Sequence, residues 1–111
     1  MHVERLEQVF KLIGKEPEPK TCAAILGITD EGDEIMAEYA GTPAQDAGLL
    51  AAAQAVEHYE MSRYGTLRTW ALELGDTEAA GLLQTTLDEE QVTDLTLTSI
   101  ATSVVNQNAE G

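Results

Sequence analysis

Four acidic residues fall on helical faces that are otherwise apolar. At 3.6 residues per turn, Glu60 lies within about 40° of a largely apolar set, made up of Leu49, Ala53, Val56, Tyr64, Leu67, Ala71 and Leu74. Glu57 lies one turn earlier, about 60° to one side. Glu90 and Asp94 occupy the same kind of position among Ala79, Leu83, Leu97, Ala101 and Val104. Because a carboxylate that faces apolar neighbours loses hydration, these acids need a compensating partner.

The four acids also fall at one level of a predicted helical hairpin. At about 1.5 Å per residue, Glu60, Glu90 and Asp94 lie about 21–27 Å from a turn near Asp76, and Glu57 is level with Asp94. Oxygen ligands on facing helices are the way in which di-iron and di-manganese bundle sites are built. The pattern therefore predicts a cation site, with iron or manganese as its occupant.

Other partners could compensate the same carboxylates. Arg63 is offset by about 60° from Glu60 on the helical wheel, so a salt bridge to Arg63 or to Arg68 is an alternative. Protons shared between acids, or a bundle edge open to water, are further alternatives. The cation is favoured because it accounts for four acids on one level.

Histidine supports the metal site only weakly. His2 lies on the apolar stripe of the first helix, one turn before Leu6, and is the candidate nitrogen ligand. His58 lies about 160° from Glu60 and is expected to be exposed. Neither long helix carries the Glu-x-x-His spacing of ferritin-type sites.

Helices must position these residues. The glycine, proline and N-cap residues along the chain predict four helices. We expect helices from His2 to Ile13, after a Thr21 N-cap, from Pro43 to Leu74, and from Thr77 to about Val105. The last two would form a long antiparallel αα-hairpin across Gly75 and Asp76. The expected fold is all-α, with residues 1–105 as a single domain and residues 106–111 as a frayed tail.

Composition excludes several classes of partner. The chain has 6 basic and 20 acidic residues and a net charge of −14, which argues against nucleic acid and anionic membranes. No apolar run approaches the roughly 20 residues of a membrane span. The single cysteine cannot form an internal disulfide, so a cytoplasmic location is expected.

Several stretches of the chain share the sequence pattern of one known family. The most specific is the run Ala-Val-Glu-His-Tyr-Glu at residues 55–60. Further matching stretches are His2–Phe10, Lys20–Cys22, Glu31–Met36, Ala52–Glu60, Arg63–Leu67 and Leu87–Glu90 with Thr93 and Asp94. Over His2 to about Ala101, the chain thereby resembles the YciE/YciF family of bacterial ferritin-like stress proteins. The resemblance implies a four-helix ferritin-like domain with a dinuclear metal site between helices. The expected function is metal binding, with oxidation of Fe(II) or handling of peroxide during stress as the chemistry such a site could support. The carboxylates that the resemblance assigns to the metal are the same four.

The resemblance also implies a departure from the family pattern. Family members have a complete first helix and a longer second one, so this chain would begin partway along the second helix. We expect a homodimer to restore the bundle, because two hairpins supply four helices. A bundle that oligomerises without metal is an alternative function. Another is an acidic module that binds a basic partner through Asp88 and Glu89.

Overall fold

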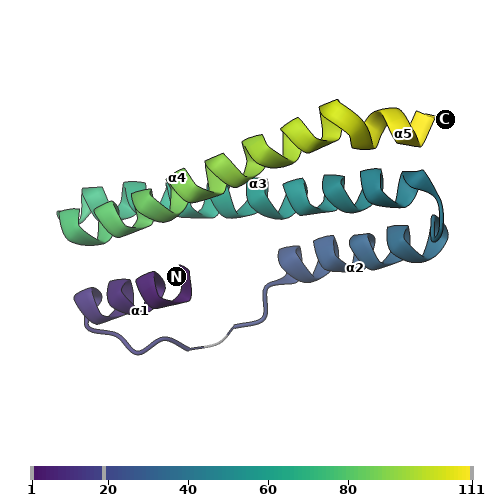
Figure 1. Cartoon of the computed structure of the whole chain (residues 1–111). Helices are drawn as coiled ribbons and strands as arrows, with labels where there is room; N and C mark the ends of the chain where they lie inside the picture. The colour runs from purple at the N-terminus through teal and green to yellow at the C-terminus, as the bar shows by residue number, and fades with distance from the viewer. Residues whose placement is uncertain (1, 19, 111) are drawn as a thin grey trace. The chain divides into compact units, whose positions relative to one another are not determined.

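The computed structural model describes residues 2–18 and 20–110, and every regular element within them is helical (Figure 1). This confirms the all-α prediction. The elements are α1 (His2–Ile13), α2 (Ala23–Glu38), α3 (Pro43–Glu73), α4 (Thr77–Ile100), a short π-helix η1 (Ala101–Val105) and α5 (Asn106–Glu110).

Glycine and aspartate set most of the helix ends. Gly14, Gly41 and Gly75 have φ angles of 73°, 77° and 77°, a left-handed conformation that an L side chain disfavours and that stops a helix. Asp76 caps α4, because its Oδ1 accepts a 3.0 Å hydrogen bond from the backbone N–H of Ala79. The Thr21 N-cap was wrong, since α2 begins at Ala23 with Cys22 as its N-cap.

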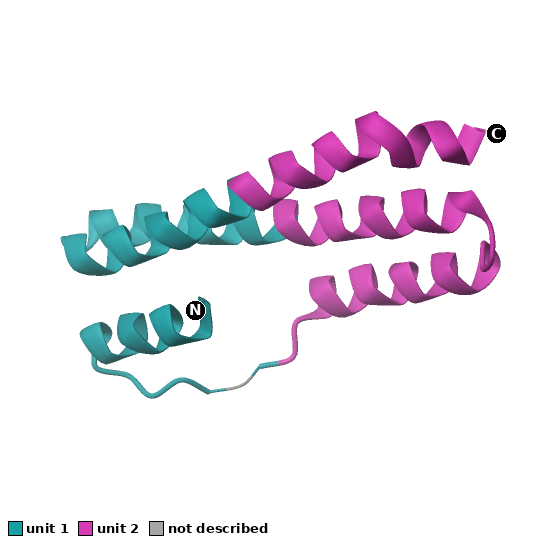
Figure 2. Ribbon diagram, in the orientation of Figure 1, with its two compact units in different colours: residues 1–20, 59–91 teal, residues 21–58, 92–111 magenta. Residues whose placement is uncertain are grey.

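The chain divides into two compact units, which are described separately (Figure 2). Unit 1 comprises residues 1–20 and 59–91, and so combines α1 with parts of α3 and α4. Among the described residues of this unit, those that are buried all lie on the inward face of α4, and they are Ala79, Ala80, Leu83, Thr86, Leu87 and Glu90. Two of these six are polar, which makes this small interior unusual.

Unit 2 comprises residues 21–58 and 92–111, and so combines α2 with other parts of α3 and α4 and with α5. Close backbone approach distinguishes it. A Cβ atom added to Gly48 would overlap Cγ2 of Ile35, and one added to Gly32 would lie 3.7 Å from Cβ of Ala52. Glycine at both positions allows α2 and this part of α3 to lie close together.

The end of α4 departs from the uniform helix that the sequence predicts. In η1 the backbone N–H of Asn106 bonds to the carbonyl of Ala101, which adds one residue to that turn. Ala101 is buried as predicted, but Val104, expected on the same face, is 53% exposed. Residues 106–110, expected to fray, are helical.

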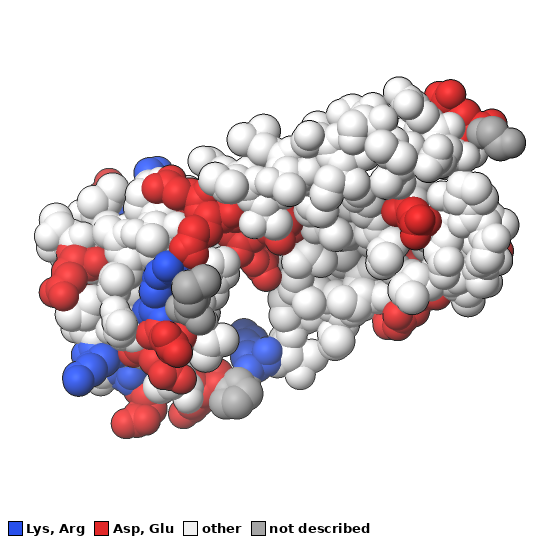
Figure 3. Space-filling model, in the orientation of Figure 1, with Lys and Arg blue, Asp and Glu red and all other residues white. Residues whose placement is uncertain are grey.

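Charge is distributed unevenly between the units. All six Lys and Arg residues belong to residues 1–20 and 59–91, and their blue surface in Figure 3 is confined to that unit. Residues 21–58 and 92–111 carry acids alone among their charged side chains. Of the helices in the described ranges, none has the length and apolar character needed to cross a membrane.

Candidate metal centre

Three of the five predicted ligands meet inside unit 1. His2 of α1, Glu60 of α3 and Glu90 of α4 each present one ligand atom, and these atoms lie within 4.8 Å of one another. Glu90 is buried, with 3% of its surface exposed, while His2 and Glu60 are half-buried. Three helices therefore contribute one candidate donor each to this group.

The helical periodicity of the sequence explains why Glu90 and His2 point inward. Glu90 follows Leu83 and Leu87 at intervals of seven and three residues, so it shares the inward face of α4. His2 precedes Leu6 by one turn on the inward face of α1. The inward orientation predicted for Glu90 is confirmed by its burial.

The electrostatics of Glu90 reflect its surroundings. Burial raises the pKa of the Glu90 carboxyl above its ordinary value, and the nearby His2 opposes this rise. The Oε1 atom of Glu90 lies 3.2 Å from Nδ1 of His2. Since a carboxylate in such a position is costly, a positive partner would be strongly favoured there.

Tyr64 completes the surroundings of the group from α3. Its ring lies edge-on to the His2 ring, with 6.5 Å between the ring centroids. Burial, and then the charge of Glu60, raise the pKa of the Tyr64 hydroxyl. Both causes keep that hydroxyl protonated.

A second network, which the sequence pattern did not predict, contacts the other ring nitrogen of His2. Glu89 Oε1 lies 3.3 Å from Nε2 of His2. Arg5 contacts both oxygens of the same carboxylate, with Nη1 2.8 Å from Oε1 and Nη2 2.7 Å from Oε2. Arg5 Nη1 also donates to Oγ1 of the buried Thr86, at 3.3 Å. The hydrogen bond from Arg5 is the main cause that lowers the pKa of Glu89.

The other two predicted ligands lie in unit 2. Glu57 is half-buried, and its Oε2 atom is buried without a hydrogen-bond partner among the described residues. Asp94 lies with its Oδ1 atom 2.9 Å from Nε2 of His58. His58 is 63% exposed, as predicted, but its pairing with Asp94 was not foreseen. As metal ligands, Glu57 and Asp94 remain predictions.

The two arginines proposed as alternative partners of Glu60 have other contacts. Arg63 lies over the ring of Tyr59, 5.3 Å from its centroid. Arg68 donates a 2.7 Å hydrogen bond to Gln84. The alternative function, binding of a basic partner through Asp88 and Glu89, also loses support, because Glu89 is already paired with Arg5.

The donor set fits a transition-metal ion. One imidazole nitrogen with two carboxylates suits iron, manganese or zinc. Metal–ligand distances near 2.1 Å allow two ligand atoms of one ion to lie up to about 4.2 Å apart. Side-chain movements of roughly half an ångström would therefore bring all three donors onto one ion.

The chain matches a known family over nearly its whole length. The model of a family described as a domain of unknown function, DUF892, matches residues 1–110. Protein YciF of Escherichia coli K12 is 42% identical over 109 residues, which are 97% of this chain and 66% of that protein. The chain thus spans slightly less than two thirds of this curated relative.

Solved structures agree with the sequence match. The crystal structure of the E. coli stress protein YciF gives a TM-score of 0.87 at 42% identity, over 95% of this chain and 67% of that one. YcfI from Rhodopseudomonas palustris gives a TM-score of 0.83 at 46% identity, over 87% of this chain and 62% of that one. These likenesses confirm the predicted ferritin-like fold.

Proposed function

This chain belongs to the DUF892 family, and from that starting point we propose that it is a YciF-like stress protein that binds a transition-metal cation. The ligands proposed for unit 1 are His2, Glu60 and Glu90. The observation that supports this most directly is the convergence of their ligand atoms within 4.8 Å of one another.

The burial of Glu90 supplies the energetic argument. The free energy of an ionised carboxylate rises when it leaves water, and Glu90 is only 3% exposed. His2 offsets part of this cost from 3.2 Å. A divalent cation would offset far more, because it brings two charges and accepts electron pairs from all three side chains.

Iron is the cation we propose, with manganese as the runner-up. Both accept mixed oxygen and nitrogen ligands, and both occur in carboxylate-rich helical bundles. In the proposed stress role, Fe(II) held by the three proposed ligands would be oxidised to Fe(III), with dioxygen or peroxide taking the electron. His2, Glu60 and Glu90 would bind and orient the ion, while α1, α3 and α4 would limit the access of water.

Elemental analysis after metal loading tests this function. The parent chain and Glu60→Ala are loaded with Fe(II) under anaerobic conditions, desalted and analysed for iron. We expect near-stoichiometric iron in the parent chain and its loss in Glu60→Ala. The matched control is Glu73→Ala, which removes an exposed acid from the same helix and should leave the iron content unchanged.

The alternative function predicts a different result. A bundle that oligomerises without metal would retain no iron in the parent chain, and a chelator would leave its melting temperature unchanged. Equal iron in the parent chain and in Glu60→Ala would place the bound metal elsewhere. Far-UV circular dichroism of each variant separates loss of metal from loss of fold.

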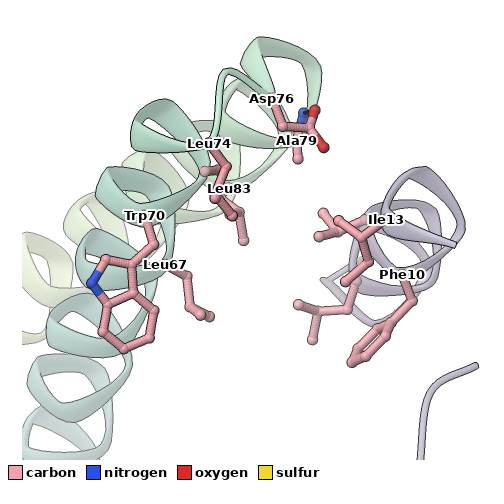
Figure 4. A pocket seen from close by; sticks show the side chains of 11 residues that line it. Phe10, Ile13, Leu67, Trp70, Leu74, Asp76, Ala79 and Leu83 are labelled. Atoms are coloured by element: carbon pink, nitrogen blue, oxygen red, sulfur yellow. Dashed lines mark hydrogen bonds between the residues drawn. The ribbon is translucent and has the colours of Figure 1, made fainter. Parts of the chain in front are cut away.

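Self-association is the partnership that we propose for this chain. An apolar groove of about 410 Å³ lies within unit 1, where Phe10 and Ile13 of α1 face Leu67 and Leu83 (Figure 4). Trp70 lines the same groove with 61% of its surface exposed. Burial of such a surface against a second copy would remove apolar area from water.

A further inference from the structure

We propose that Glu89, held by Arg5, is a positioning residue that orients the imidazole of His2 so that its Nδ1 atom faces the cation site. This inference rests on the proposed metal function. It assigns a role to a carboxylate that is not itself among the three grouped ligands.

The contacts of His2 assign its two ring nitrogens to different tasks. Nε2 lies 3.3 Å from Oε1 of Glu89, and Nδ1 lies 3.2 Å from Oε1 of Glu90. Neutral imidazole carries a hydrogen on one nitrogen and a lone pair on the other. A hydrogen on Nε2, donated to Glu89, leaves the lone pair of Nδ1 directed toward Glu90 and the cation.

Carboxylate–histidine–metal arrangements of this kind are general in metal sites. The acceptor on the far nitrogen fixes the tautomer and the ring orientation, and it raises the basicity of the ligating nitrogen. Removal of such an acceptor typically weakens metal binding by about 10–100-fold. Glu89 has the chemistry and the position for this role.

Arg5 restricts where Glu89 can lie. Its guanidinium contacts both carboxylate oxygens, at 2.8 and 2.7 Å, and a two-point contact fixes a carboxylate plane better than a single hydrogen bond does. Arg5 also contacts Thr86, which is 2% exposed and therefore well anchored. Because Arg5 follows His2 by three residues on α1, the two side chains share one face.

A purely structural role for Glu89 would be to join α1 to α4 through Arg5. That role predicts changes in stability alone. A positioning role also predicts changes in metal affinity and in the state of the His2 ring hydrogen, and both can be measured.

The test uses Co(II) as the probe. Its visible absorption reports how tightly it binds, and the paramagnetic ion shifts the ring N–H resonance of a histidine that ligates it. Glu89→Ala should bind Co(II) about 10–100-fold more weakly than the parent chain. In this variant the shifted ring N–H resonance of His2 should no longer be observed, because the N–H would exchange rapidly with water. Glu89→Gln keeps an acceptor for Nε2–H and should recover much of the affinity.

Two further variants serve as comparisons. Asp88→Ala removes the neighbouring exposed acid, which accepts a hydrogen bond from Gln84, and should change the affinity by less than about threefold. Arg5→Met keeps the aliphatic stem but releases Glu89, and should weaken binding by several fold. Thermal melts of all four variants show whether each one folds.

The outcomes separate this inference from the function on which it rests. If the parent chain binds Co(II) and Glu89→Ala binds it equally well with the N–H resonance intact, Glu89 has no positioning role and the metal site stands. Equal losses in Glu89→Ala and Asp88→Ala would show a general effect of charge, and would also overturn the inference. A parent chain that binds no Co(II) would overturn both proposals.

Discussion

Glu90 has opposite effects on the stability of the fold and on the proposed binding of metal. It lies on the inward face of α4, one turn after Leu87. An apolar side chain at this position would stabilise the fold better. The Glu90 carboxylate faces His2 of α1 and Glu60 of α3. Burial raises the pKa of this carboxyl, and the charge of His2 offsets only part of that rise.

Substitution of Glu90 by glutamine should therefore stabilise the metal-free chain at neutral pH. Burial raises the pKa of Glu90 in the folded state, so the contribution of this carboxyl is fully present below its ordinary pKa and is lost as pH rises through the raised value. Glu90→Gln avoids that loss. At pH 7 we expect a gain of about 1 kcal/mol in the free energy of unfolding, the scale of a typical single substitution.

Urea unfolding at pH 7 and at about pH 4 measures this gain, which should shrink at the lower pH. Asp88→Asn is the control, since it neutralises an exposed acid two residues away. A Glu90→Gln variant that is less stable than the parent chain at pH 7 would contradict the argument. The same variant should bind metal more weakly, as is common when stability and function conflict.

Helix α3 illustrates how the need for glycine varies along one element. It runs for 31 residues, and none of them is fully buried. Gly48 lies where an added Cβ atom would overlap the branched side chain of Ile35. Gly65 lies in the same helix, and an added Cβ atom there has nothing within 4 Å.

Alanine at these two glycines should have opposite effects on stability. Gly48→Ala should destabilise the chain by about 1–3 kcal/mol, because Ile35 would have to move and overpacking is costly. Gly65→Ala should stabilise it by about 0.5–1 kcal/mol through higher helix propensity. Urea denaturation of both variants checks the prediction. A Gly48→Ala variant more stable than the parent chain would contradict it, by showing that Ile35 and α2 can move aside at little cost.

The proposed self-association rests on apolar side chains that lie outside the small interior. Leu74 is 84% exposed and Trp70 is 61% exposed, and both line the groove in unit 1. The net charge of −14 opposes association of two copies, so apolar contact has to supply the favourable term. High salt, which screens the repulsion, should strengthen the dimer.

Trp70→Lys should convert the proposed dimer to a single chain. Sedimentation at tens of micromolar should give twice the mass of one chain for the parent and one chain mass for the variant. Leu95→Lys changes a residue that is 68% exposed and does not line the groove, and it should leave the dimer intact. A parent chain that sediments as a monomer would contradict self-association.

Local signals made much of this architecture predictable. Glycine, proline and aspartate marked the helix ends at Gly14, Pro43 and Asp76, where backbone conformation depends on one or two residues. The inward face of Glu90 followed from helical periodicity alone. The N-cap at Cys22 was missed because Thr21 is a chemically better cap, and no sequence rule favours a cysteine there.

Contacts between distant segments were much less predictable. Arg5 and Glu89 are separated by 84 positions, and nothing local to either residue indicates the other. The wheel for the last helix failed at Val104, because a wheel assumes 3.6 residues in every turn and the π turn breaks that assumption. The pairing of His58 with Asp94 was missed for the same reason as that of Arg5 with Glu89.

The π turn at Ala101–Val105 has a consequence for how the length of this chain can vary. One residue more or less in a helix rotates everything beyond it by about 100°. Within α4 before Glu90, such an insertion or deletion would turn that carboxylate away from His2. A deletion in the π turn would only convert it to an α-helical turn, and His2, Glu60 and Glu90 would keep their register because all three precede it. Single-residue deletions among natural homologues should therefore accumulate in this turn and be absent from the segment between Asp76 and Glu90.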